Sequence, residues 1–396
     1  MKNMKGCLTA MLLFFLLPAF AQELNHSVLE DIKRKAFDTH SDAVIIMQNG
    51  SIVYEDYFGA EEKPIYIASA GKSLVALAIG RLIDDGLLDS LDQPVHTLYP
   101  QWKQGNKKDI TIRMLLNHTS GLQNNPNASV ELEPPPDHQV HNVIELALAA
   151  ELSSMPGEKV AYNNKAVALL GGIIEEASGK RMDAYFEDHF FAPLGITQYD
   201  WIRDKSGNPT AHGAFVLKPS DLLKFGQLLL DRGVYDEKRI LSEERIDRML
   251  RQGQEFTPIW GLLWWRLPEY EKRIVDGEIW DSWQAAGMSE DLMRRLDPLK
   301  GKLFATKSEY YAAMKASLGE GWYQVLRNAL PEGEKLSKRI YSDHITAYYA
   351  DGFRGNYLVI VPEHDIVAVR CADHEGFNYQ TDFFTDFARL VSELGK

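Results

Sequence analysis

The chain has 396 residues, of which 45% are hydrophobic, and a formal net charge of −13. This length and apolar content allow a large core, in one big two-lobed unit or in two domains. The acidic balance argues against nucleic acid or an anionic membrane as a partner, and it leaves a small-molecule substrate open.

Residues 1–21 have the pattern of a secretory signal peptide. A basic start precedes the apolar run Leu8–Phe20, which ends in the small-x-small cleavage pattern Ala19-Phe20-Ala21. The run is short for a membrane anchor, so cleavage before Gln22 is favoured. We therefore expect a periplasmic or secreted protein with no membrane span after cleavage. Its remaining cysteine would be Cys371, so we expect no intramolecular disulfide.

Both ends of the chain predict antiparallel strands. Near the start, Ala43–Met47 and Ile52–Tyr54 flank Asn49-Gly50. Asn-Gly between β-rich runs is the strongest short hairpin signal, because both turn residues tolerate positive φ. Near the end, Tyr357–Val361 and Ile366–Val369 form a matching pair. We expect the strands from the two ends to share one sheet.

Most of the intervening chain has helical periodicity. The helices predicted there, and one that follows the last strand, are Ser73–Leu88, Ile112–Leu116, Val143–Leu152, Ala166–Ser178, Met182–Phe191, Ser220–Arg232 and Thr381–Leu394.

The stretch from about 270 to 338 is rich in charged and aromatic residues, and we interpret it as a helical insertion. Its predicted helices are Ser289–Leu296, Ser308–Ala316 and Trp322–Ala329. Two interpretations stay open. The insertion is an elaboration with a small core of its own, or it is a lid or specificity element with aromatic wall residues Trp280, Trp283, Tyr310, Tyr311 and Trp322.

The tetrad Ser69-Ala70-Gly71-Lys72 lies where an extended segment turns into an apolar helix. A hydroxyl and an amine three residues apart on a helix lie on one face, one turn apart. The amine can then take the serine proton and make a good nucleophile, while the helix start favours developing negative charge. A serine followed by a lysine is also an ordinary helix start, so the tetrad needs support from the rest of the chain.

A second group of polar residues, Tyr162-Asn163-Asn164, precedes the predicted helix Ala166–Ser178. In an extended segment, Tyr162 and Asn164 point to the same side. A phenol beside a lysine is a plausible proton relay, and an amide can hold a substrate carbonyl and the lysine together. The alternative is a turn asparagine beside a half-buried tyrosine.

A third motif runs from Leu115 to Leu122 and contains His118 and Ser120. It predicts a short amphipathic helix that ends in a glycine-terminated loop. A histidine in such a place is more often a structural hydrogen-bonding group than a base, so we leave His118 and Ser120 out of the catalytic set.

The ordered motifs together resemble the penicillin-recognising serine hydrolases. Within that superfamily the chain is similar to the branch that holds class C β-lactamases, D-alanyl-D-alanine carboxypeptidases, family VIII esterases and aminohexanoate-oligomer hydrolases. The motifs that carry the resemblance are Ser69-x-x-Lys72, Leu115–Leu122, Pro156-Gly157-Glu158-Lys159, Tyr162-Asn163-Asn164, Gly171-Gly172, Pro193-Leu194-Gly195, Trp264-Trp265 and Gly355-Asn356. The resemblance covers most of the chain except residues 270–338.

This resemblance implies one serine hydrolase domain, 22–396, whose fold class is α/β in the form of the two-lobed α+β fold of the β-lactamases. An antiparallel sheet from both chain ends, flanked by helices, would pack on an all-helical lobe with the active site between them. Ser69 would be the acylated nucleophile and Lys72 its proton acceptor. Tyr162 would share the proton shuttling, and Asn164 would position substrate and lysine.

The family's third motif, Lys-Thr-Gly or His-x-Gly, is replaced here by Ala350-Asp351-Gly352. It belongs on an edge strand beside the site, where Phe353 would supply the second backbone N–H of an oxyanion hole. The basic residue that helps to bind a β-lactam carboxylate is missing, and Asp351 would repel that group. Arg354 is the candidate substitute, and Gly355-Asn356 fits the variant motif of the aminohexanoate-oligomer hydrolases, which makes Asn356 a further substrate-binding candidate.

We therefore predict an exported serine hydrolase that forms an acyl-serine intermediate with a small ester, amide or peptide substrate and needs no cofactor. One alternative is a β-lactamase or D-alanyl-D-alanine carboxypeptidase. Another is a non-catalytic member of the fold that binds a cell-wall fragment or a partner. A metal-dependent hydrolase is disfavoured, because the eleven histidines show no His-x-x-x-His or His-Glu-x-x-His spacing.

Overall fold

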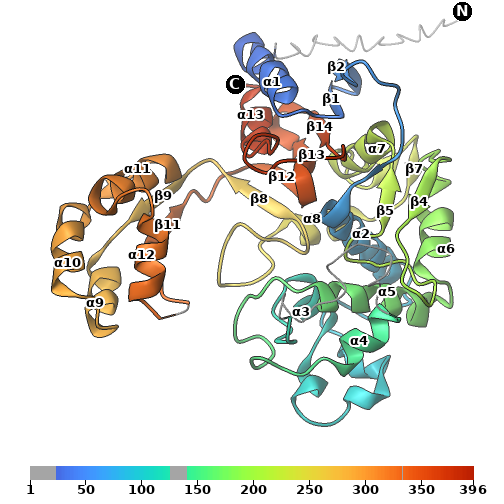
Figure 1. Ribbon diagram of the computed structural model, residues 1–396. Helices are drawn as coiled ribbons and strands as arrows, with labels where there is room; N and C mark the ends of the chain where they lie inside the picture. The colour runs from blue at the N-terminus through green and yellow to red at the C-terminus, as the bar shows by residue number, and fades with distance from the viewer. Residues whose placement is uncertain (1–23, 125–140, 332) are drawn as a thin grey trace, which may run out of the picture.

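Both ends of the chain contribute to one six-stranded antiparallel sheet (Figure 1). The computed structural model describes residues 24–124, 141–331 and 333–396, so the predicted signal segment 1–21 lies outside the described residues. In spatial order the strands are β2 (Ser51–Asp56), β1 (Ala43–Gln48), β14 (Ile366–Cys371), β13 (Asn356–Val361), β12 (Ile345–Gly352) and β8 (Trp265–Pro268). The prediction that strands from the two chain ends share one sheet is confirmed.

The central strands are apolar on both faces because helices cover both sides of the sheet. Val44 and Ile46 point to a layer formed by α1 (His26–Asp38) and α13 (Phe387–Glu393), whereas Ile45 points into the main core. On that second side α7 (Pro219–Leu230) packs so closely that a Cβ at its Gly226 would lie 2.3 Å from Val367. Strands that are buried on both faces lose the alternation of polar and apolar residues.

The helical lobe lies beside this sheet and is built around α2 (Gly71–Asp84) and α5 (Asn164–Ser178), which pack against each other in the main core. Its other helices are α3 (Ile112–Leu116), α4 (Val143–Ala149) and α6 (Met182–Phe186). Two small sheets and one helix complete the body. The first sheet has the order β3 (Ile65–Tyr66), β5 (Phe215–Leu217) and β4 (Tyr199–Trp201), and the second pairs β6 (Val234–Tyr235) with β7 (Lys238–Arg239). The helix is α8 (Glu243–Leu250).

Residues 271–341 form a third lobe that stands to one side of the body, joined to it through β8 and β12 (Figure 1). Its helices are α9 (Gly277–Ala285), α10 (Glu290–Leu296), α11 (Lys307–Leu318) and α12 (Trp322–Ala329). The lobe also contains a three-stranded sheet of β10 (Leu303–Phe304), β9 (Glu271–Ile274) and β11 (Lys338–Tyr341), which the sequence did not predict. Its side chains form a separate hydrophobic core that includes Trp283 and Tyr310.

Several predicted helices have other bounds in the structure, and two of them differ markedly. The helix predicted over Thr381–Leu394 begins only at Phe387, because Asp382 accepts hydrogen bonds from the Asn378 amide and the Thr381 hydroxyl and so holds a turn. The helix predicted over Met182–Phe191 widens into a π turn after Phe186. The first helix, α1, was missed, although it covers one face of the sheet.

Candidate active site

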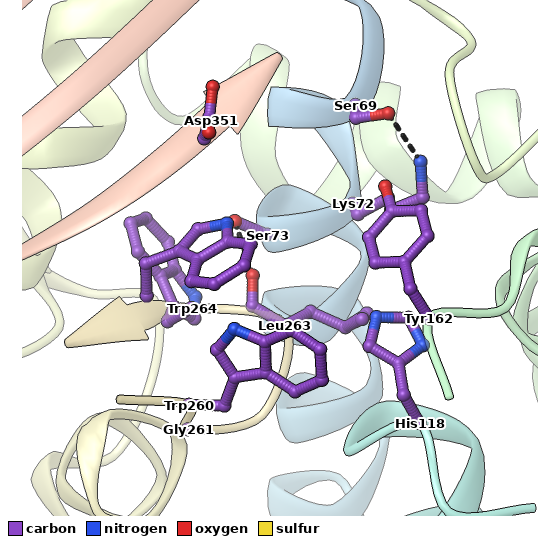
Figure 2. A pocket seen from close by; sticks show the side chains of 11 residues that line it. Ser69, Lys72, Ser73, His118, Tyr162, Trp260, Gly261, Leu263, Trp264 and Asp351 are labelled. Carbon is purple, nitrogen blue, oxygen red and sulfur yellow. Dashed lines mark hydrogen bonds between the residues drawn. The ribbon is translucent and has the colours of Figure 1, made fainter. Parts of the chain in front are cut away.

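Ser69 lies in the single helical turn Ala68–Ala70 that leads directly into α2. The preceding residue, Ala68, has φ of 50°, a left-handed conformation that is costly for a residue with a Cβ and is often found at functional sites. One turn further on, Lys72 Nζ lies 2.6 Å from Ser69 Oγ and donates to the His212 carbonyl at 2.5 Å (Figure 2). The turn therefore aims the serine hydroxyl at the lysine amine.

Lys72 is buried, with 3% of its surface exposed. Burial removes water from the ammonium, disfavours the charged form and lowers the Lys72 pKa from 10.5 to about 7. The two hydrogen-bond partners found for Nζ among the described residues are a hydroxyl and a carbonyl, and neither is a carboxylate that would restore the charge. At neutral pH a large share of Lys72 is therefore the free amine that a proton acceptor must be.

Tyr162 closes the same group from the loop that precedes α5. Its ring centroid lies 5.2 Å from Lys72 Nζ, and its hydroxyl points toward Ser69 and Lys72 in Figure 2. The side chains around the phenol remove water and raise its pKa to about 12, although the hydrogen bond with Ser69 acts in the opposite direction. Tyr162 is therefore a neutral hydroxyl at neutral pH, able to pass a proton but not to start as a phenolate base.

His118 fixes the loop that carries Tyr162. Its Nδ1 accepts a hydrogen bond from the Asn163 amide at 3.2 Å, and its ring lies 4.7 Å from the Tyr162 ring. Burial lowers the His118 pKa to about 3, with the nearby Lys72 acting in the same direction, so the imidazole is neutral. This geometry agrees with the structural role that the sequence assigned to His118.

The rest of the Leu115–Leu122 motif connects two walls of the site. The Asn117 carboxamide donates to the Gly253 carbonyl at 2.9 Å, and the Leu116 carbonyl accepts from the Leu263 amide at 3.0 Å, so this side of the motif holds residues 253–263. On the other side the Asn163 carboxamide donates to the Leu122 carbonyl at 2.7 Å. The motif is therefore a scaffold between the tyrosine loop and the turn that follows Gly253.

The turn Trp260–Trp265, here called the tryptophan turn, forms the floor of a pocket beside Ser69. The Gly261 amide donates to the Trp264 carbonyl at 2.9 Å, and Ser73 on α2 donates to the Leu263 carbonyl at 2.5 Å. The pocket has a free volume of about 30 Å³, and its lining includes Ser69, Lys72, His118, Tyr162, Trp260, Trp264, Trp265 and Asp351 (Figure 2).

A second and larger cavity of about 720 Å³ lies between the body and the third lobe. Trp260 lines both cavities, so the groove begins next to the Ser69 pocket. Of the aromatic wall residues proposed from the sequence, Tyr310, Tyr311 and Trp322 line this groove, whereas Trp280 and Trp283 belong to the core of the lobe. The lobe thus combines a core of its own with one aromatic face toward the groove.

Asn164 takes the first position of α5, where it is buried and its carboxamide oxygen has no hydrogen-bond partner among the described residues. It does not hold Lys72 as predicted, because the His212 carbonyl occupies that role. A carbonyl oxygen contributed by the backbone leaves no signature in the sequence, which is why His212 was missed.

Gly352 brings the third motif against the nucleophile. A Cβ at Gly352 would lie 2.2 Å from the Ile67 carbonyl and 3.0 Å from the Ala70 amide, so only glycine lets β12 approach the Ser69 turn this closely. Phe353 follows directly, with its side chain 55% exposed and packed edge-on against Tyr379. The backbone at Phe353 therefore lies beside the turn that carries Ser69.

The sequence predicted that the third motif lies on an edge strand. In the structure β12 is an edge strand only at its end. β8 pairs with β12 from Ile345 to Tyr349 and then ends, so Ala350, Asp351 and Gly352 extend beyond it. The free edge needed at the site exists only for these last residues.

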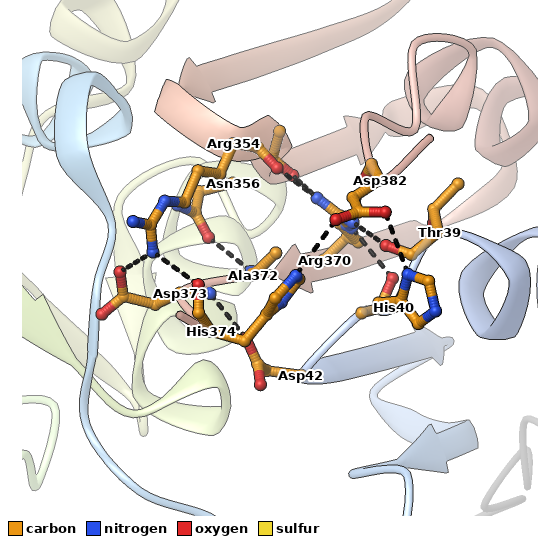
Figure 3. Close-up of polar contacts among 12 residues, drawn as sticks. Thr39, His40, Asp42, Arg354, Asn356, Arg370, Ala372, Asp373, His374 and Asp382 are labelled. Carbon is orange, nitrogen blue, oxygen red and sulfur yellow. Dashed lines mark hydrogen bonds and ion pairs between the residues drawn. The ribbon is translucent and has the colours of Figure 1, made fainter. Parts of the chain in front are cut away.

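The two remaining substrate-binding candidates make internal contacts in the structure, and their role toward a substrate stays a prediction. Arg354 donates to the Asp373 carboxylate at 2.7 Å and to the His374 carbonyl, and it does not line the Ser69 pocket (Figure 3). Asn356 is 1% exposed, and all its polar atoms are used internally. Its carboxamide donates to the Phe353 and Tyr66 carbonyls and accepts from the Ala372 amide, so it braces the turn that follows β12.

Arg370 on β14 was also missed, although it donates hydrogen bonds to the turn that follows β12. It is fully buried and donates to the carbonyls of Arg354, Gly355, Thr39 and Asp382 and to the Ser41 hydroxyl (Figure 3). A buried arginine in an apolar strand has no distinguishing sequence signal, because its partners are backbone carbonyls far apart in the chain.

None of the helices in the described ranges is long and apolar enough to cross a membrane. Within the same ranges, no cluster of three or more His, Cys, Asp or Glu side chains is arranged to hold a metal ion.

Known proteins resemble this chain in sequence and in structure. The Bacillus subtilis protein PbpX is 27% identical over 232 residues, which are 50% of this chain and 57% of PbpX. The D-alanyl-D-alanine-carboxypeptidase/endopeptidase AmpH of Escherichia coli is 23% identical over 256 residues, 56% of this chain and 64% of AmpH. The matched part thus spans less than two thirds of either relative.

The fold is also found in the crystal structure of a candidate β-lactamase from Bacteroides dorei. That structure superposes with a TM-score of 0.62 at 20% identity and covers 93% of this chain and 98% of the other. The β-lactamase family model matches residues 30–382, which include every motif that carries the family resemblance. This match shows that the chain belongs to the β-lactamase family of serine hydrolases.

Proposed function

We propose that this protein is an exported serine hydrolase that cleaves a small ester, amide or peptide through an acyl-Ser69 intermediate. The observation that carries the proposal is the 2.6 Å approach of Lys72 Nζ to Ser69 Oγ, with Lys72 buried and its pKa lowered to about 7. A hydroxyl paired with an amine that is free at neutral pH is an activated nucleophile. The name of the relative AmpH, a carboxypeptidase and endopeptidase, supports amide substrates.

In the proposed reaction, Lys72 Nζ takes the Ser69 proton while Oγ bonds to the substrate carbonyl carbon and the carbonyl electron pair moves onto oxygen. The backbone amides of Ser69 and Phe353 would stabilise that oxyanion, since Gly352 brings the two segments together. The C–O or C–N bond then breaks, and the leaving group takes a proton from Lys72 through the Tyr162 hydroxyl. Water attacks the acyl carbon along the same proton path, which releases the acid and restores Ser69.

Esters and amides without a carboxylate are favoured over β-lactams. Lys72 is the one lysine or arginine among the described residues that line the pocket, and it is committed to Ser69. Arg354, the candidate carboxylate ligand, is paired with Asp373 instead. A β-lactam carboxylate would therefore meet Asp351 rather than a cation.

Covalent labelling tests the proposal. We expect a fluorophosphonate to add its mass to Ser69 of the wild-type protein, and Ser69→Ala to remove both this label and the hydrolysis of 4-nitrophenyl acetate. The chain offers Ser73 as a matched control, since its hydroxyl lines the same pocket but donates to the Leu263 carbonyl. Ser73→Ala should keep the label.

If the wild-type protein takes no label and hydrolyses the ester no faster than Ser69→Ala does, the protein is a binding member of the fold and the enzyme proposal is wrong.

Export is tested separately. We expect the protein recovered outside the cytoplasm to begin near Gln22 by mass spectrometry, and an unprocessed N-terminus there would contradict the signal-peptide assignment.

A further inference from the structure

Asp351 places a carboxylate in the Ser69 pocket. It comes from the part of β12 that extends beyond β8, and Figure 2 shows it across the pocket from Lys72 and Tyr162. Asp351 is half-buried, and no hydrogen bond or ion pair is found for its carboxylate among the residues that the structure describes. The fully buried carboxylates in the described part of the chain have partners, such as Asp183 with Arg181 and Arg203.

An unpaired carboxylate in a pocket is costly, because burial removes water and supplies no compensating charge. Burial accordingly raises the Asp351 pKa to about 7. A cationic group that entered the pocket would remove this cost, whereas an anionic group would add to it. The other titratable groups that line the pocket do not reverse this preference, because His118 and Tyr162 are neutral and Lys72, whose pKa is lowered to about 7, is only partly charged at neutral pH.

The remaining wall of the pocket is aromatic. Trp260, Trp264 and Trp265 line it together with Asp351, and indole faces attract ammonium groups. The free volume of about 30 Å³ exceeds the roughly 10–15 Å³ that is needed to admit one water molecule, so a primary ammonium fits in the pocket.

We propose that Asp351 and the tryptophan turn bind a primary ammonium group of the substrate, close to the carbonyl that Ser69 attacks. The proposal rests on the hydrolase function proposed above and narrows its substrate class to amino esters, amino amides or peptides with a free amine. The site thus reverses the charge preference of a carboxylate-binding pocket, because Ala350 stands where the third motif has its basic residue and the carboxylate of Asp351 follows it.

Two pairs of isosteric substrates test this proposal on either side of the scissile bond. The acyl-side pair is the 4-nitrophenyl ester of β-alanine and that of butanoic acid. The leaving-group pair is 4-(aminomethyl)phenyl acetate and 4-ethylphenyl acetate. We expect the wild-type protein to prefer the ammonium member of at least one pair in kcat/KM by roughly 10- to 100-fold, the range of a charge-assisted hydrogen bond.

Asp351→Asn keeps the shape of the side chain and removes its charge, so we expect it to bring that ratio close to one. Asp351→Glu should keep most of the preference. The matched control is Asp343→Asn, an exposed carboxylate on the same segment just before β12, which should behave like the wild type. Fluorophosphonate labelling of Ser69 in each variant shows that the protein is folded and competent.

Two results would overturn the proposal: no ammonium preference in either pair for a wild-type protein that hydrolyses the neutral esters, or a preference that survives Asp351→Asn. Both differ from a failure of the hydrolase function itself, in which Ser69 takes no label and no ester is cleaved.

Discussion

At the residue scale, the environment of Lys72 decides what the Ser69–Lys72 pair can do. The same two residues on an exposed helix would give a charged lysine and an inert hydroxyl, because an ammonium in water holds its proton at neutral pH. Here burial favours the free amine, and a backbone carbonyl rather than a carboxylate completes its hydrogen bonding. The neutral Tyr162 is left to relay protons.

The first prediction is the pH dependence of Ser69 acylation. Because the lowered pKa of Lys72 is about 7, the fraction of free amine falls as the pH drops below 7. We expect the acylation rate to fall by about tenfold per pH unit there and to level off above about pH 8. The measurement is the rate of fluorophosphonate labelling between pH 5.5 and 9.

Asp351 faces the same pocket and has a pKa raised to about 7, so it is the control for this profile. His118 and Tyr162 do not titrate in this range, since their pKa values are about 3 and about 12. If the decrease in acylation rate below pH 7 is caused by protonation of Lys72, the same decrease is found in Asp351→Asn. A flat profile in the wild-type protein would show that Lys72 is not the base.

At the scale of single elements, the end of β12 determines whether an oxyanion hole can form. The strand leaves β8 after Tyr349 and then runs against the Ser69 turn, with Gly352 at the point of contact. A strand that continued its pairing with β8, or a side chain at Gly352, would keep the Phe353 amide away from the nucleophile. The position of this element is therefore as important as its sequence.

The second prediction concerns Gly352→Ala. The new Cβ would lie 2.2 Å from the Ile67 carbonyl, so β12 must move away from the Ser69 turn. We expect kcat for 4-nitrophenyl acetate to fall by roughly 10²- to 10³-fold, the usual effect of losing one oxyanion donor. Gly277→Ala is the control, because no atom lies within 4 Å of its new Cβ. Equal kcat values for the two variants would contradict the placement of the oxyanion hole.

At the scale of the whole molecule, Arg370 connects both chain ends to the active site. Its guanidinium binds Thr39 and Ser41 near the N-terminus, Asp382 near the C-terminus and the turn Arg354–Gly355 beside the third motif. One side chain thus holds together segments that are more than 300 residues apart. Arg370 itself is 331 positions from Thr39 in the sequence.

The third prediction is that Arg370→Met destabilises the fold and slows the labelling of Ser69. Methionine fills the space but leaves several buried carbonyls without donors, each of which costs about 1–3 kcal/mol. We expect a loss of at least about 3 kcal/mol in the free energy of unfolding, measured by urea denaturation. Arg34→Met removes an exposed arginine and should change stability little. If the two variants had the same midpoint, Arg370 would not be a structural anchor.

The sequence by itself determined the sheet from both chain ends, the helices around the site, and the candidate set Ser69, Lys72 and Tyr162. These follow from local physics, since periodicity, turn chemistry and the spacing of Ser-x-x-Lys are properties of neighbouring residues. The ordered motifs carried the family resemblance that the match over residues 30–382 confirms.

Only the tertiary structure decided which polar groups face the pocket and which form internal hydrogen bonds that hold the fold. Arg354 and Asn356 looked available in the sequence, but they are bound to Asp373 and to backbone groups. The His212 carbonyl was not predicted, and Trp264-Trp265 was noted only as a family motif and not as a wall of the pocket. The reason is physical: a hydrogen bond or a desolvated charge depends on partners brought together by folding across 100 residues or more, such as the 140 positions between Lys72 and His212.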